Sequence, residues 1–501
     1  MPEANDSTLP RPFPLKIRER NLMKACLPAL GILSVLTAHL LNPASCPGQS
    51  APVAPSVVSA SDSVWSDSPR PYLQDDDLIS VGHWNQSCDS ADQPCDVACD
   101  AIGATSGCQG DLWTRSNLAG DWGGVRTVLT EHGIVANVSL TQFYQGVVSG
   151  GRQKDFEYGG KLDYIFTLEG AKLGLNEGFF ATIHAETRYG RDPILESSVL
   201  APSNANMLYP EFDDSTAITE LQIMQAFSEE WAVTFGKFNA FDFLNMVYPQ
   251  TGRGIDGFMN LSTFLPMTLV RTVPLSFLGA GVVKLNEKRV QGALLVYDSN
   301  NITTTSGFDE LFDNGANILG MYRIFTELGG KPGSHGLLAT WANGTYTSLD
   351  RTDWTFLPPL GLMPGSDTGT WSAVYIAEQQ IWADSRNPHR NIGLLSEWGL
   401  ADPRTTPFDW SANVALQGQG LMECRPADTA GVAWFYNGIS DDLKQLTSPL
   451  LRLEDVHGLE VYYNAAITPW FHLTVDLQYV DPSLARRSDA FIFGLRGKLD
   501  L

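Results

Sequence analysis

The feature that most limits how this chain can fold is an alternation of apolar and polar residues that recurs from residue 134 to residue 501. The segment KLDYIFTLEG (161–170) places Leu162, Tyr164 and Phe166 on one side, opposite Lys, Asp and Thr residues. The same alternation recurs in FFATIHAETRYG, GLEVYYNAAITPW, HLTVDLQYV and FIFGLRGKLDL. Because successive side chains of a strand point to opposite faces, each segment predicts a β-strand with one apolar and one polar face.

Two all-β architectures fit strands of this kind. In a soluble sandwich or propeller the apolar faces form the core, whereas in an outer-membrane barrel they meet lipid and the polar faces line the interior. Three features favour the barrel: an export signal, a final alternating strand, and aromatic residues that close several segments. These aromatic residues are Tyr144, Tyr189, Trp398, Trp470 and Tyr479. No uninterrupted apolar run long enough for a helical span follows the signal.

The chain carries a candidate secretory signal near its N-terminus. Lys24 is followed by an apolar run from Ala25 to Leu41 and by small residues at Ala44 and Ser45. We expect residues 1–46 to be the signal region, with Met23 as the true start. A transmembrane anchor and lipidation of Cys46 are the less favoured alternatives.

Residues 47–111 form a linker rich in Ser, Asp and Pro with four clustered cysteines. In an exported protein, such a cluster predicts two disulfides among Cys88, Cys95, Cys99 and Cys108, with three pairings open. The spacing does not fit a common zinc site. Cys424 stands apart from the others.

Composition and motifs exclude several functions. With 33 basic and 56 acidic residues and a net charge of −23, the chain offers no broad basic face for nucleic acid. It contains no G-x-S-x-G, H-E-x-x-H or phosphate-binding loop, so the sequence predicts neither an enzyme nor a cofactor site. The acidic run FDELFDNG (308–315) lacks the spacing of a calcium loop and favours a solvated loop over a metal site.

A short helix is predicted before the first strand. In LAGDWGGVRTVLTEHGI (118–134), Asp121 can cap the helix, Val125, Val128 and Leu129 form an apolar stripe, and Gly133 can end it.

This segment resembles the opening motif of the carbohydrate-selective porin (OprB) family, L-x-GDWGG-x-R-x-x-L-x-x-x-GI. Similar blocks follow in the same order, including HAETRYG, APSNANMLYP, GKFNAFDFLNMVYPQTGRGIDGFMN and the closing QYVDP with FGLRGKL. The chain departs from the family at Cys424, before R-P-x-D, and at Leu501, where an aromatic residue is usual.

The resemblance implies a transmembrane antiparallel β-barrel over residues 135–501, preceded by a periplasmic helix segment at 112–134. It implies sixteen strands, a count that agrees with about 23 residues per strand and connection after Ile134. It also implies diffusion of small neutral sugars across a bacterial outer membrane, with membrane lipids and the assembly machinery as partners. Monomer and trimer stay open. A general small-solute pore and an exported carbohydrate-binding protein or barrel enzyme are the alternatives.

A sugar channel needs paired charges and amides that replace the hydrogen bonds of water. Glu186 and Arg188 lie two residues apart on one predicted face and are the first choice for such a pair, and His184 is predicted to line the lumen. The further pore-lining candidates are Glu220, Gln222, Lys237, Asp242, Arg253 and Arg271. Asp121, Trp122 and Arg126 are expected to hold the helix against the barrel base or to narrow its mouth. Loops 190–216 and 350–370 are candidates for external or constriction loops.

Overall fold

The computed structural model describes residues 111–191, 200–210, 214–249, 255–357, 361–448 and 450–501. The predicted signal, the linker up to residue 110 with its four cysteines, and Arg253 lie outside the described residues. Cys424 is a free cysteine of intermediate exposure.

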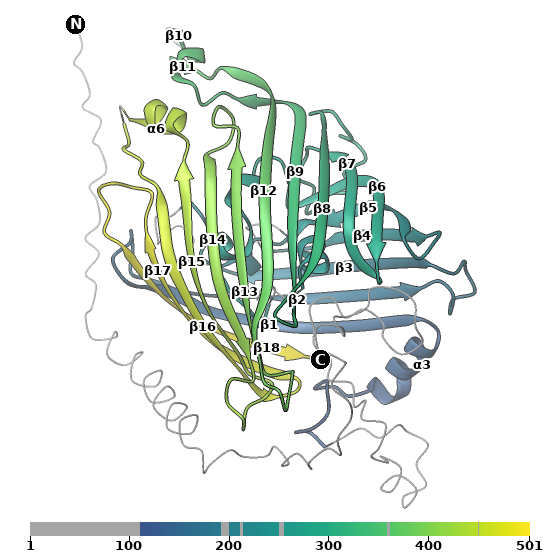
Figure 1. Ribbon diagram of the computed structural model, residues 1–501. Coiled ribbons are helices and arrows are strands. Elements are labelled where there is room, and N and C mark those ends of the chain that lie inside the picture. Colours follow the sequence, from purple (N-terminus) through teal and green to yellow (C-terminus); the bar gives the residue numbers. More distant parts are fainter. Residues whose placement is uncertain (1–110, 192–199, 211–213, 250–254, 358–360, 449) are drawn as a thin grey trace, which may run out of the picture. The chain divides into compact units, whose positions relative to one another are not determined.

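Sixteen strands of the described residues form one closed barrel in which each strand pairs antiparallel with its neighbours (Figure 1). The predicted strand number and fold class are therefore confirmed. The barrel strands are β1 (Ile134–Ser149), β2 (Phe156–Glu169), β3 (Phe179–Gly190), β4 (Ser215–Ala226), β5 (Trp231–Asn239), β6 (Ser276–Asn286), β7 (Arg289–Asp298), β8 (Ala316–Leu328), β9 (Lys331–Thr347), β12 (Ser366–Ala383), β13 (Asn391–Ala401), β14 (Phe408–Gln419), β15 (Thr429–Ile439), β16 (Val456–Thr468), β17 (Phe471–Asp481) and β18 (Ala490–Asp500).

The other elements of the described residues are short. They are the hairpin β10 (Thr355–Leu357) and β11 (Gly361–Met363), the α-helices α3 (Val125–Glu131), α4 (Ala240–Val247), α5 (Leu261–Phe264) and α6 (Asp441–Thr447), and the 3₁₀ turns η2 (Trp122–Gly124), η3 (Ala205–Met207), η4 (Met267–Leu269) and η5 (Arg351–Asp353). No helix among the described residues has the length and apolar character needed to cross a membrane.

The two predicted faces of the strands are confirmed by burial. On β17, Leu477 is 54% exposed, whereas its neighbours Asp476 and Gln478 are 0% and 2% exposed. On β16, Leu459 and Val461 are exposed on either side of the buried Glu460. Apolar side chains thus cover the outer wall, where lipid surrounds a membrane barrel, and polar side chains point inward.

The two edges of the barrel differ in the length of their connections. Turns of two residues join β6 to β7 (287–288) and β8 to β9 (329–330) on the edge where β1 begins and β18 ends. The opposite edge carries the long connections, including 191–214 and 240–275. Outer-membrane barrels place short turns in the periplasm and long loops outside, so the edge with α3 is the periplasmic one. The β10–β11 hairpin lies in the predicted loop 350–370. Figure 1 shows it beyond the ends of β9 and β12 on the edge with the long connections.

The interior is not uniformly polar, which differs from the expectation for a barrel wall. The inward faces of β6 to β9 carry the buried apolar residues Leu285, Leu295, Leu319 and Leu338. These residues share one hydrophobic cluster with Phe243 and Val247 of α4. The strands are apolar on this face because a chain segment inside the barrel packs against them.

The predicted helix is present but shorter than the motif, as η2 followed by α3. Gly124 occupies the N-cap position. Asp121 lies three residues before Gly124, and its carboxylate accepts from the main-chain N–H of Thr127 in the first turn of α3 at 2.8 Å. The predicted apolar stripe is not buried, because Val125 and Val128 are 50% and 52% exposed. Gly133 ends the segment with a φ of 80°, as predicted.

A charge on the outer face of β17 is expected to destabilise the barrel. Leu477→Arg places a guanidinium near the middle of the lipid-facing wall, which should lower the free energy of unfolding by about 2–4 kcal/mol. Denaturant unfolding in lipid vesicles measures the change. The control is Leu451→Arg, because Leu451 is 46% exposed in the β15–β16 connection. Equal losses in both variants would contradict a lipid-facing position for Leu477.

Candidate functional site

Two segments from the long-loop edge lie inside the barrel. The small inner segment (residues 200–210) belongs to the β3–β4 connection, and the large inner segment (residues 240–275) is the β5–β6 connection. The large segment bonds to inward residues around the wall. Asn413 of β14 donates to the Thr263 carbonyl at 3.0 Å, and Tyr297 of β7 donates to the Thr272 carbonyl at 2.8 Å. These bonds to separate strands show that the segment crosses and narrows the interior.

The inner segments have their own apolar core. Phe241 of α4 lies between Tyr209 of the small segment and Phe264 of the large segment, with ring centroids 5.0 and 4.5 Å away. The helix begins where the Asn239 side chain accepts from the main-chain N–H groups of Phe241 and Asp242. This packing gives the two segments a fixed position relative to each other.

A cluster of charged side chains lies beneath α4 on the wall formed by β2 and β3. The Lys161 ammonium lies 2.8 Å from both Asp163 Oδ1 and Glu186 Oε1. His184 bridges to the large inner segment, because its Nε2 lies 3.0 Å from Asp163 and its Nδ1 lies 2.6 Å from Asp242. Lys161 and His184 therefore alternate with carboxylates through a buried network.

The charged cluster extends onto β4 and β5. Thr219 Oγ1 donates to the second oxygen of Glu186 at 2.5 Å, and the main-chain N–H of Asn239 donates to Glu220 at 3.3 Å. Four of the sequence-predicted residues, His184, Glu186, Glu220 and Asp242, thus come together at one place.

The cluster has the outline of a metal site but contains its own cation. Ligand atoms of Asp163, His184 and Glu186 lie within 4.8 Å of one another. The Lys161 ammonium already bonds to both carboxylates of this group. The positive charge of Lys161 therefore compensates the two carboxylates, as a bound metal ion would.

The two residues of the predicted Glu186–Arg188 pair lie on the same strand. Both residues lie on the inward face of β3 and are buried, at 1% and 2% exposure. Glu186 forms an ion pair with Lys161 on the neighbouring strand. In the register of β2 and β3, Lys161 lies opposite Arg188 and Asp163 lies opposite Glu186. Lys161 therefore reaches Glu186 diagonally across the two strands.

The other predicted residues that the structure describes bond to groups outside this cluster. Gln222 donates to Thr234 on the barrel wall at 2.9 Å. Lys237 donates to the main-chain carbonyl of Thr305 at 2.8 Å, in the β7–β8 connection. Arg271 donates to the Thr405 carbonyl at 3.0 Å.

A second anchor of the large inner segment was not singled out from the sequence. Arg323 of β8 donates to the main-chain carbonyl of Val247 at the end of α4. Its guanidinium lies 5.1 Å from the ring centre of Tyr248 and 4.7 Å from that of Phe325. The alternation of β8 could have placed Arg323 inward, but no signal in the sequence identified its partner carbonyl.

The helix segment on the periplasmic edge contacts the last strand. Arg126 donates to the main-chain oxygen of Leu501 at 2.8 Å and stacks on Trp122 with 4.4 Å to the ring centre. Burial lowers the pKa of Arg126 below its usual value, against the opposing effect of Asp121 and Asp500. The Leu118 N–H also donates to the Asp500 carbonyl at 2.7 Å.

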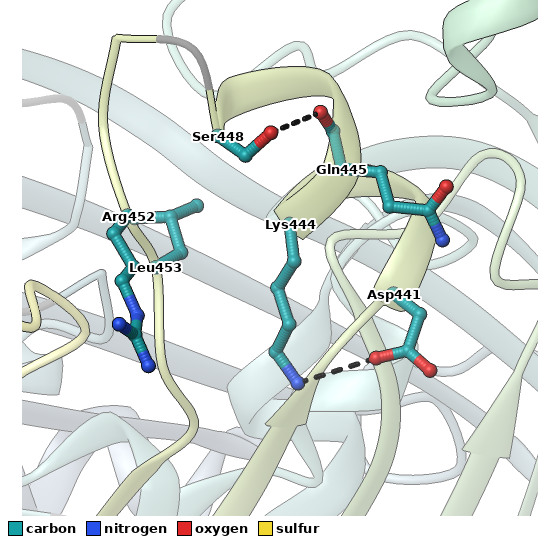
Figure 2. Close-up of a pocket in the computed structure, with 6 residues that line it drawn as sticks. All are labelled: Asp441, Lys444, Gln445, Ser448, Arg452 and Leu453. Carbon is teal, nitrogen blue, oxygen red and sulfur yellow. Dashed lines mark hydrogen bonds and ion pairs between the residues drawn. The ribbon is translucent and has the colours of Figure 1, made fainter.

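A pocket of about 330 Å³ lies outside the barrel, in the β15–β16 connection (Figure 2). Lys444 of α6 pairs with Asp441 at 3.5 Å and with Asp455 at 2.7 Å. Burial raises the pKa of Asp455, but hydrogen bonds from Lys444 and from the Ile439 N–H outweigh it and hold the pKa below its usual value. This pocket belongs to an external loop and is distinct from the constriction.

Comparisons with known proteins agree with this architecture. The profile of the family described as "Carbohydrate-selective porin, OprB family" matches residues 153–501. Porin B of Pseudomonas aeruginosa is 24% identical over 131 residues, which cover 23% of this chain and 28% of that protein. The chain thus matches little more than a quarter of the length of this relative.

Among solved structures, the high-pH structure of Pseudomonas putida OprB matches with a TM-score of 0.65 at 18% identity. The match covers 78% of this chain and 99% of that chain, and it shows a shared fold. The low-pH structure of the same protein gives a TM-score of 0.49 at 15% identity with the same coverage. Because the family profile spans more than two thirds of the chain, this protein belongs to the carbohydrate-selective porin, OprB family.

Proposed function

We propose that this outer-membrane porin lets small neutral sugars diffuse passively through the constriction formed by its two inner segments. The observation that carries the proposal is the charged cluster of Lys161, Asp163, His184, Glu186 and Asp242 at the junction of the barrel wall and the large inner segment. Membership of a carbohydrate-selective porin family supports it.

The chemistry of the cluster suits a sugar hydroxyl, which both donates and accepts hydrogen bonds. Asp242 is the residue of the cluster best placed to meet a solute. Its side chain is 15% exposed, compared with 9% for Lys161 and Asp163, 6% for His184 and 1% for Glu186. One Asp242 oxygen bonds to His184, which fixes the carboxylate, and the exposed part can accept from a hydroxyl.

His184, which is itself bonded to Asp163, holds Asp242 in place. A fixed acceptor can exchange one water for one sugar hydroxyl without moving, which keeps the barrier to passage low. The interaction must stay weak, because a tightly bound sugar would block the channel it enters. The family is one of channels, and this role needs no covalent step.

The proposal is tested by single-channel recording of the refolded protein in a planar bilayer, titrated with glucose and with a neutral amino acid of similar size. Block that depends on glucose concentration and is absent with the amino acid is the expected result. Conductance with no block by either solute would contradict sugar selectivity and indicate a general small-solute pore. Folded protein that forms no channels would contradict the porin function.

Removing the charge of Asp242 is expected to weaken sugar block. In Asp242→Asn the hydrogen bond to a hydroxyl loses its charge assistance, so the blocking constant for glucose should rise by about tenfold. Titration of the single-channel current measures it. The control is Asp441→Asn in the external pocket, where the side chain is 85% exposed and the block should not change. Equal block in Asp242→Asn and in the wild-type protein would show that Asp242 does not contact the sugar.

A further inference from the structure

The large inner segment is also held by charged residues on β16 to β18, away from the Asp242 cluster. Glu460 of β16 is fully buried at 0% exposure. Its carboxylate accepts from the main-chain N–H groups of Met259 and Asn260, at 2.5 and 3.1 Å, and from Thr263 Oγ1 at 2.6 Å. One wall carboxylate therefore receives two main-chain donors and one hydroxyl from the same short stretch of chain.

Two basic side chains of β18 add to the attachment. Arg496 of β18, also at 0% exposure, donates to the Gly257 carbonyl at 2.8 Å. Lys498 on the same strand lies 3.1 Å from Asp256 Oδ2. Acceptors of the wall thus face donors of the segment, and donors of the wall face its acceptors. This complementary pattern fixes the register of residues 256–263 against the wall.

The same stretch of the large inner segment also binds the small inner segment through main-chain hydrogen bonds. The Ala205 N–H donates to the Met259 carbonyl at 2.7 Å, and the Leu261 N–H donates to the Pro202 carbonyl at 2.9 Å. Gln478 of β17 joins the two, because its Nε2 donates to the Ser203 carbonyl and its Oε1 accepts from Asn260. Displacing residues 259–263 would therefore move both inner segments.

We propose that Glu460 is the positioning residue that sets the width of the constriction. Acting through the amides of Met259 and Asn260, it holds both inner segments to one wall and so fixes the space left beside them. The inference rests on the proposed function only where sugar is the probe. The inference goes beyond the proposed function because it assigns the width of the passage to a residue of the barrel wall that does not contact the solute.

The experiment compares Glu460→Gln with the wild-type protein in planar bilayers. The amide keeps the size of the side chain but replaces one acceptor oxygen with an NH₂ group, so either the Met259 N–H or the Thr263 hydroxyl loses its acceptor. We expect a heat-modifiable, folded barrel with a broadened conductance distribution, a larger cut-off for neutral polyethylene glycols, and a glucose blocking constant raised by about fivefold. Glu460→Asp, which keeps the carboxyl group, should recover part of the wild-type block.

The matched control is Asp298→Asn. Asp298 is likewise 0% exposed, and its carboxylate accepts from the N–H groups of Asn300 and Phe312, each at 3.0 Å, in an external connection. It should leave conductance and polymer cut-off unchanged. A merely structural role for Glu460 would make both variants alike, and wild-type conductance, cut-off and block in Glu460→Gln would overturn the proposal.

A second measurement applies if Glu460→Gln does not fold. Hydrogen exchange of the wild-type protein should show the Met259 and Asn260 amides protected to the level of the barrel strands, and rapid exchange at both would overturn the proposal. Failure of the sugar hypothesis is seen separately, since the wild-type protein would then show no glucose block. The conductance distribution and polymer cut-off would still test Glu460.

Discussion

Replacing Lys161 by methionine is expected to destabilise the protein more than any surface change. The variant leaves Asp163 and Glu186 buried, each without the ammonium that lies 2.8 Å away in the native protein. Breaking a buried ion pair by removing one partner costs about 3–5 kcal/mol, because the remaining charge is desolvated without compensation. The free energy of unfolding in lipid vesicles, from denaturant titration, measures the loss.

The control for this prediction is Lys172→Met. Lys172 pairs with Glu169 at 3.1 Å, but both side chains are partly exposed and lie at the periplasmic edge. An exposed pair contributes about 0–1 kcal/mol, so little change is expected. Adding Asp163→Asn and Glu186→Gln to Lys161→Met removes the uncompensated charges and should recover much of the stability. A triple variant no more stable than Lys161→Met would show that packing, not charge, explains the loss.

Truncating Phe258 is the second change with a large expected effect. Phe258 is 0% exposed, and its ring meets Tyr462 of β16 edge-on with centroids 4.8 Å apart. The ring fits because Gly431 on β15 has no side chain, and a Cβ there would lie 2.7 Å from it. Phe258→Ala should cost about 3–5 kcal/mol through lost burial and the cavity left behind.

The same substitution at an exposed site is the control for Phe258→Ala. Phe308 is 70% exposed in the β7–β8 connection, so Phe308→Ala should stay within about 0.5 kcal/mol of the wild-type stability. Both variants are measured by denaturant unfolding in vesicles. Losses of similar size would mean that the large inner segment contributes little to the folded state, contrary to its packing.

The barrel was predictable from the sequence because alternation is a local property. Whether Glu460 or Leu459 points inward follows from their neighbours in the chain, and burial confirms the assignment. The partners of inward residues are not local. Met259 and Glu460 are 201 residues apart, and no spacing rule joins an amide to a carboxylate at that distance.

The candidate site was therefore predicted in part. His184 and Glu186 were identified from the polar face of one strand, and Asp242 and Glu220 from matching family blocks. Lys161 was placed on a polar face, but its role as the cation between two carboxylates depends on the register of β2 and β3. The apolar inward faces of β6 to β9 could not be predicted from the alternation of each strand alone. They are apolar because the large inner segment, which is distant in the sequence from β8 and β9, packs on them.

The pairing of β1 with β18 has a consequence for the order of folding. The first barrel strand in the sequence, β1, has the last strand, β18, as one of its two neighbours, with Tyr144 opposite Leu495. Contacts between such distant residues carry a large loop-closure cost and slow the search for the native topology. Until β18 is in place, two strand edges with unsatisfied amides and carbonyls face lipid or water, where they can pair with other chains. The edges of β1 and β18 are therefore satisfied only when these two strands, the first and last of the barrel, pair with each other.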